Sequence, residues 1–274
     1  MFNFQFAGWL TPYINDIIKK GAENQITDLD FIRRELNKFM SSPKRFDMIK
    51  GYNYYIGKHD VLNLKRTAIG PDGELVQIDN LPNNRIVNNQ YSKIIDQKVN
   101  YLFGKEIMFN TENKRYSKLL NDYVFNAEFD RLIQSIAEDS FNCGIGWLYV
   151  GYDETGKLNM RRIKPWQILP GWADEEHTKL NYAIRVYPVL VYEKKTEKEI
   201  LKIEVYDNKG ITKFIKDGGS IYPDGVNWQV PYFYAENTGL GWNKIPLIAF
   251  KANRNEQSLL KRVKGLQDAL NIML

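Results

Sequence analysis

The chain has 274 residues, of which 43% are hydrophobic and 14% are aromatic, including 17 Tyr. This aromatic content is unlike that of disordered proteins and indicates a folded chain of one or two domains. The net charge is only +5, from 38 basic and 33 acidic residues. A dedicated DNA-coating protein carries a stronger or more clustered basic excess, so the balance permits a nucleic-acid partner without requiring one.

The single cysteine, Cys143, excludes an internal disulfide and lies in an apolar stretch, where a buried inert thiol in a reducing compartment is expected. The apolar residues 1–10 carry no basic group at their front and are too short to span a bilayer. No later apolar run is long enough either. These features predict a soluble, intracellular protein without a membrane partner.

The first half of the chain has the periodicity of helices. Apolar residues recur at helical spacing through 29–39, behind a capping-box pattern formed by Thr27 and Asp30. The sequence Ser-Ser-Pro at 41–43 interrupts that helix and predicts a second one, which runs to Gly57.

Residues 61–84 have weak periodicity, and Pro71-Asp72-Gly73 predicts a turn inside a loop or loose hairpin. Three helices are then expected, over 91–102 with a stop at Gly104, over 116–123, and over 129–144.

At Trp147 the apolar period changes from that of helices to that of strands. A hairpin turn at 153–156 and a second turn at 207–210 separate the expected strands. The charged segment 193–199 (EKKTEKE) is typical of an exposed hairpin tip or strand edge. The strands are expected at 147–152, 158–163, 182–192, 200–206 and 211–215. Together they predict an antiparallel meander with one buried and one wet face.

The chain ends in another predicted helix with a narrow apolar seam of coiled-coil type. The seam consists of Leu259, Val263, Leu266, Leu270 and Met273. Packing on the chain's own core is the simpler interpretation, and contact with a neighbouring subunit is the alternative. Three cations, Lys261, Arg262 and Lys264, are expected on the polar side, as candidate phosphate contacts or as a solvated face. No terminator follows the helix, so a longer natural chain is expected.

No catalytic constellation is evident in the sequence. Two distant histidines, His59 and His177, and one cysteine cannot form a common zinc site. The acidic stretch 174–177 leaves an all-carboxylate magnesium site open, although a solvated loop is the simpler interpretation. Neither a nucleophile elbow nor a phosphate-binding P-loop is present. The cations of 161–166 (RRIKPW) could contact phosphate or simply face solvent. We therefore expect a structural or binding protein without a cofactor or metal.

Four segments in order resemble the portal proteins of long-tailed bacteriophages, a family also found in Gram-positive prophages. They are YNYYIGKHDVLNLKR at 52–66, NNRIVNNQYSKIIDQKVNYLFGKEI at 83–107, CGIGWLYVGYDETGKLNMRRIKPWQILPGWAD at 143–174 and GLGWNKIPLIAFKANRNEQSLLKRVKGLQDALN at 239–271. No single motif is strong, but the combination covers nearly the whole chain.

The resemblance implies a non-enzymatic subunit of a ring, usually a dodecamer, at the capsid vertex of the virion. It implies assembly in the host cytoplasm and contacts with terminase, capsid or scaffold, and head–tail connector proteins, while double-stranded DNA passes without sequence specificity. The implied fold is α+β. It consists of a mainly helical part at 1–144, a β-rich wing part at 145–250 and, at 251–274, the start of a long helix, truncated before the stem, clip and crown.

Within that expectation Leu259, Val263, Leu266 and Leu270 are candidate subunit contacts, and Lys261, Arg262 and Lys264 are candidate DNA-facing residues. Two alternatives remain at this point. One is a metal-dependent nucleic-acid-processing enzyme that uses Asp174 or Glu175, and the other is a protein-binding module of a different large assembly.

Overall fold

The computed structural model describes residues 29–78, 83, 85–153, 155–193, 196–235 and 238–273. The chain forms two compact units, each built from separated stretches of sequence. Unit 1 comprises Met1–Ser42 and Gln167–Ile245, and unit 2 comprises Pro43–Trp166 and Pro246–Leu274. The expected division into 1–144, 145–250 and 251–274 follows chain order and stays a prediction.

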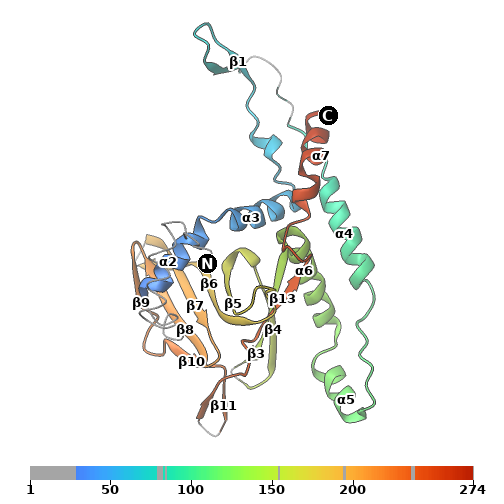
Figure 1. The fold of residues 1–274 in the computed structure, drawn as a ribbon, viewed down its shortest axis with the longest axis vertical. Helices are drawn as coiled ribbons and strands as arrows, with labels where there is room; N and C mark the ends of the chain where they lie inside the picture. The colour runs from blue at the N-terminus through green and yellow to red at the C-terminus, as the bar shows by residue number, and fades with distance from the viewer. Residues whose placement is uncertain are drawn as a thin grey trace, which may run out of the picture. The chain divides into compact units, whose positions relative to one another are not determined.

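In the part of unit 1 that the structure describes, the helix α2 (Leu29–Met40) covers an antiparallel sheet (Figure 1). The strand order is β10-β8-β7-β6-β5, with β9 also pairing with β8. The strands are β5 (Ile168–Trp172), β6 (Leu180–Glu193), β7 (Thr196–Tyr206), β8 (Gly210–Asp217), β9 (Ser220–Pro223) and β10 (Gln229–Pro231). A short hairpin, β11 (Phe233–Ala235) with β12 (Thr238–Leu240), follows them.

The core of unit 1 lies between α2 and one face of this sheet. Val186 lies opposite Ile203, and Ile184 opposite Val205, so the alternating apolar residues of β6 and β7 form direct cross-strand pairs. The helix contributes Ile32, Leu36 and Phe39 to the same cluster. On the other face Arg185 pairs with Glu204 at 3.1 Å. The prediction of a meander with one apolar and one polar face is therefore confirmed for β6–β8, and β5 adds a strand that the sequence pattern did not predict.

Unit 2 combines helices with a three-stranded sheet of order β13-β3-β4. Its longer helices and its strands are α3 (Pro43–Tyr55), α4 (Gln90–Phe103), α5 (Lys114–Tyr123), α6 (Ala127–Cys143), α7 (Leu260–Met273), β3 (Ile145–Tyr152), β4 (Leu158–Ile163) and β13 (Leu247–Lys251). A 3-10 turn, η2 (Asp60–Asn63), precedes an exposed hairpin of β1 (Thr67–Ile69) and β2 (Leu75–Gln77).

The β3–β4 hairpin lies outside the meander in which the sequence placed it. Its third strand is β13, where Ala249 lies opposite Trp147. The helix α6 packs on this sheet through Ile133 and Ile136, which contact Leu148. A strand so distant in sequence completes the sheet because the apolar face of α6 must be covered.

The boundaries of the helices follow local signals. Asn89, Asn113 and Asn126 each accept a backbone N–H at the start of α4, α5 and α6. Gly144 ends α6 with φ 88°, a left-handed conformation that favours glycine. The helices expected from periodicity are confirmed, as are the turn at 71–73 and the α+β class. The capping partner Thr27 lies outside the described residues.

Candidate functional site

The last helix, α7, and Leu259 just before it contain the candidate contact residues predicted from the sequence. Leu260 is buried, and Leu259 and Val263 pack beside it against a cluster that includes Tyr54 and Tyr91. Two members of the predicted seam thus contact the core of unit 2 itself. Leu266 is 77% exposed and Leu270 is half-buried, so the seam does not lie on a single buried face.

Two polar side chains occupy the buried face of α7 in place of an apolar stripe. Gln267 accepts the backbone N–H of Tyr91 at 2.9 Å and donates to the carbonyl of Asn88 at 2.8 Å. Asn271 accepts the N–H of Asn88 at 3.1 Å. These hydrogen bonds to backbone atoms at the start of α4 give both buried amides polar partners. Hydrophobic periodicity cannot reveal such residues.

Lys264 points into an ion-pair cluster within unit 2. Its ammonium lies 2.8 Å from Asp60 and 2.5 Å from Asp268. Burial lowers the pKa of Lys264, but hydrogen bonds to Asp268 and Asp60 outweigh that effect and raise it. Burial likewise opposes ionisation of Asp60, yet Lys264 and Lys50 lower its pKa to about 2. Tyr54 donates to Asp268 at 2.7 Å. The charge of Lys264 is therefore balanced locally.

The other two cations of α7 are exposed. The side chain of Lys261 is 61% exposed and lies 4.0 Å from Asp47. Arg262 is exposed as well. Flexible cations of this kind can contact phosphate oxygens without reading sequence.

The cations of the basic and aromatic stretch 161–166 contact other side chains of unit 2. Arg162 pairs with the carboxylate of Asp139, which is buried. Arg161 stacks over Tyr149 at 4.6 Å. Lys164 lies 5.0 Å from the ring of Tyr52, and burial lowers its pKa. The structure therefore assigns packing roles to these cations.

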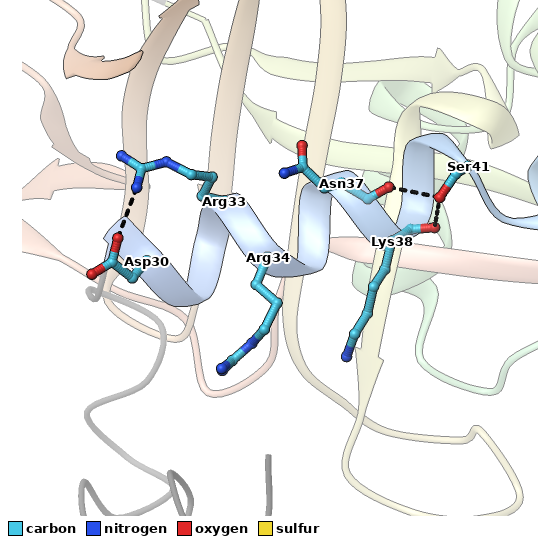
Figure 2. A pocket seen from close by; sticks show the side chains of 6 residues that line it. All are labelled: Asp30, Arg33, Arg34, Asn37, Lys38 and Ser41. Carbon is cyan, nitrogen blue, oxygen red and sulfur yellow. Dashed lines mark hydrogen bonds and ion pairs between the residues drawn. The ribbon is translucent and has the colours of Figure 1, made fainter. Parts of the chain in front are cut away.

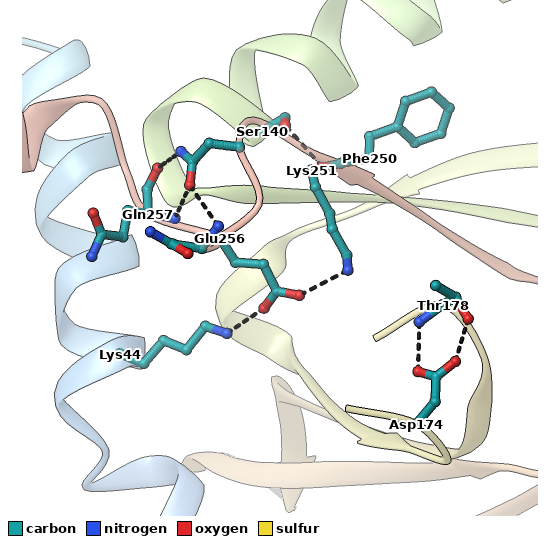
Figure 3. Close-up of polar contacts among 10 residues, drawn as sticks. Lys44, Ser140, Asp174, Thr178, Phe250, Lys251, Glu256 and Gln257 are labelled. Carbon is teal, nitrogen blue, oxygen red and sulfur yellow. Dashed lines mark hydrogen bonds and ion pairs between the residues drawn. The ribbon is translucent and has the colours of Figure 1, made fainter. Parts of the chain in front are cut away.

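A buried carboxylate anchors the loop that leads into α7 (Figure 3). Glu256 has a side chain only 2% exposed and pairs with Lys44 at 2.5 Å and with Lys251 at 3.4 Å. Its φ is 51°, so a non-glycine residue adopts the left-handed region here. The next residue, Gln257, is held by Asn253, whose side-chain oxygen accepts its N–H at 3.1 Å. Loop and helix are thereby fixed to α3 and β13.

A surface hollow of about 490 Å³ lies along the outer face of α2 (Figure 2). Polar residues line it: Asp30, Arg33, Arg34, Asn37, Lys38 and Ser41. Arg33 pairs with Asp30 at 2.8 Å, and Lys38 pairs with Glu35 at 3.0 Å. These contacts are ion pairs between side chains of α2 itself and do not place a nucleophile beside a base.

The residues considered for enzymatic chemistry have structural partners. Asp174 accepts the backbone N–H of Thr178 at 2.6 Å and its hydroxyl, and these bonds lower the pKa of Asp174 while they close its loop. Burial raises the pKa of Cys143, which keeps the thiol protonated. Throughout the described ranges, no three His, Cys, Asp or Glu side chains gather in a way that could hold a metal ion.

Comparison with known proteins gives a consistent result. The family described as phage portal protein, SPP1 Gp6-like, matches residues 44–274. The portal protein of Bacillus phage SPP1 is 26% identical over 269 residues, which cover 94% of this chain and 50% of that protein. The portal protein of Clostridium phage phiCD119 is 24% identical over 238 residues, which cover 82% of this chain and 50% of that protein.

The chain is a phage protein of the portal class, and it belongs to the SPP1 Gp6-like family of portal proteins. It spans about half the length of the curated relatives that it matches. Among the helices that the structure describes, none has the length and apolarity to cross a membrane.

Proposed function

We propose that this chain is the N-terminal part of a portal subunit, which assembles with copies of itself into a ring at the capsid vertex. The ring forms the channel for packaging and ejection of double-stranded DNA. The observation that carries the proposal is the family match over residues 44–274. The role is structural rather than enzymatic, and the loop-closing contacts of Asp174 agree with that.

The partners we propose are a second copy of the chain, terminase, capsid or scaffold proteins and head–tail connector proteins. Assembly takes place in the host cytoplasm, and the assembled ring resides in the virion. The match to two phage portal proteins supports these partners.

We further propose that the exposed side of α7 contributes to the contact between subunits. Leu266 is 77% exposed, Ile272 is 66% exposed and Met273 is 82% exposed. A cyclic ring uses two different patches of each subunit, so an apolar helix face suits one half of such a contact. Of the residues predicted from sequence, Leu266 and Leu270 would touch the neighbour, whereas Leu259 and Val263 would hold α7 in place.

For DNA, we propose Lys261 and Arg262 as phosphate contacts. Both are exposed. Lys264 remains a candidate from the sequence, but its contacts with Asp60 and Asp268 favour a positioning role.

The test of assembly is the mass of the purified chain by light scattering over a range of concentrations. A ring would have many times the 32.1 kDa of one chain. Leu266→Asp should reduce the mass toward the monomer, whereas Leu190→Asp, a matched change at a residue 58% exposed in unit 1, should not. A species that stays monomeric at every concentration would refute the idea that these 274 residues carry the ring contact.

The test of DNA contact is the salt dependence of duplex binding. Lys261→Gln with Arg262→Gln removes two phosphate contacts. The magnitude of the negative slope of log K, the DNA association constant, against log salt concentration should therefore fall by about 1.8. The control is Lys114→Gln with Arg115→Gln, which changes two exposed cations on α5. Equal losses in both double variants would contradict a specific role for α7.

A further inference from the structure

His59 is a buried titratable side chain next to α7, and only 1% of it is exposed. Its ring stacks on Tyr54 with 4.4 Å between centroids. Nε2 lies 3.0 Å from the carbonyl oxygen of Tyr54, and Nδ1 lies 2.8 Å from Nδ2 of Asn271. His59 therefore connects the end of α3 and the start of η2 to the last helix.

The orientation of the Asn271 amide is fixed by its other contacts. Its oxygen accepts the backbone N–H of Asn88 at 3.1 Å and the side-chain amide of Gln267 at 3.1 Å. Reversing the amide would place its NH2 group against two donors. The NH2 group therefore faces His59.

This orientation defines the protonation state of His59. Nδ1 must accept a hydrogen bond from Asn271, so the proton of the neutral ring is on Nε2, which donates to the carbonyl of Tyr54. Both ring nitrogens are used, and only the neutral imidazole can do both, because Nδ1 must carry no proton in order to accept. A second proton on Nδ1 would place an N–H against the NH2 group of Asn271.

The charged groups around His59 come from several elements. Asp60 follows it on η2, Lys50 lies on α3, and Lys264 and Asp268 lie on α7. The two carboxylates would attract an imidazolium, but they already pair with the two lysines. Asp60, with its pKa lowered to about 2, stays ionised under mildly acidic conditions. Neither carboxylate faces Nδ1 of His59 in the way that the Asn271 amide does.

We propose that His59 is an acid-sensitive latch for the C-terminal helix. At neutral pH the neutral ring holds Asn271, and through it the bonds to Asn88 and Gln267. When His59 takes up a proton, Asn271 must turn away, and α7 loosens from α3, η2 and the residues before α4. If the proposed function holds, acid then alters the helix that offers Leu266 to a neighbouring subunit.

The first experiment is nitrogen NMR of the chain labelled with 15N at histidine. The sequence contains only His59 and His177, so two sets of resonances are expected, and His177→Gln assigns them. At about pH 7.5 the shifts of His59 should show a proton on Nε2 and a bare Nδ1. The opposite tautomer would overturn the proposal.

The second experiment is hydrogen exchange of the α7 amides, corrected for intrinsic rates, at about pH 7.5 and about pH 5. Protection should fall by about tenfold or more in acid, as expected for the loss of buried hydrogen bonds. Asn271→Asp should reverse this dependence, because a carboxylate still accepts from Asn88 and Gln267 and now also accepts the second proton of His59.

Two further variants complete the test. His59→Asn should make the protection of α7 independent of pH, and His177→Gln should leave the acid-induced loss as it is in the parent chain. The proposal is wrong if the parent shows no loss, or if Asn271→Asp or His59→Asn loses protection in acid as the parent does. These measurements do not depend on ring formation, which light scattering reports separately.

Discussion

Removal of one partner of the ion pair between Asp139 and Arg162 should strongly destabilise unit 2. The side chain of Asp139 is 1% exposed, whereas that of Arg162 is 23% exposed. Two guanidinium nitrogens contact the two carboxylate oxygens. Burial lowers the pKa of Arg162, but Asp139 outweighs that effect and raises it. Removing one partner of such a pair costs about 3–5 kcal/mol, since the other charge stays buried alone.

The exposures of the two partners predict unequal effects. Arg162→Met leaves a fully buried carboxylate and should lower the free energy of unfolding by about 4–5 kcal/mol. Asp139→Asn leaves a cation that still reaches water and keeps one acceptor, so about 2–3 kcal/mol is expected. The variant with both changes should cost less than the sum by about 2 kcal/mol or more, because no buried charge remains.

The measurement is denaturant unfolding followed by tryptophan fluorescence, with the four chains of a double-mutant cycle. Arg161→Met is the control, because Arg161 is exposed and only stacks on Tyr149, so a loss below about 1 kcal/mol is expected. Additive effects of the two substitutions, or a control as damaging as Arg162→Met, would refute the reasoning.

Three other outcomes are expected. Gly51→Ala should destabilise the chain by about 1–3 kcal/mol in denaturant unfolding, because a Cβ there would lie 1.8 Å from the carbonyl oxygen of Asn142. Gly265→Ala has open space around the new Cβ and should stabilise α7 by up to about 1 kcal/mol. Changes of the same sign in the free energy of unfolding of the two variants would contradict this. Cys143, with its raised pKa and 2% exposure, should resist an aromatic disulfide reagent at about pH 8 until the chain is unfolded, and rapid labelling of the folded chain would disprove the buried thiol. Because the pKa of Asp60 is lowered from 3.8 to about 2, its contribution to stability is present above pH 3.8 and is lost as the pH falls toward 2. Asp60→Asn should flatten that part of the curve of unfolding free energy against pH. An unchanged curve would count against the ion pairs of Asp60 with Lys50 and Lys264.

The sequence alone predicted the elements whose signals are local. The end of α6 at Gly144 and the turn at 71–73 depend on residues within a few positions, and the structure confirms them. The α+β class follows from the change of period near Trp147. The resemblance to portal proteins, built from four ordered segments, is confirmed by the family match over 44–274.

Which face of α7 is buried could not be predicted in this way. Periodicity favoured the line of Leu259, Val263 and Leu266, whereas the structure buries Gln267 and Asn271. The spacing of apolar residues shows only how apolar and polar side chains are distributed around one helix. It does not show that backbone groups near residue 88, far away in the sequence, will satisfy two amides.

The partners of the charged residues were equally out of reach. The sequence treated Arg162 and Lys264 as exposed cations, but tertiary packing brings Asp139 to one and Asp60 to the other. Tertiary packing also pairs β13 with β3 and builds each unit from stretches that are separated in the sequence. Local conformation is determined by neighbours along the chain, whereas burial of a charge or an amide depends on partners that only the folded chain brings close.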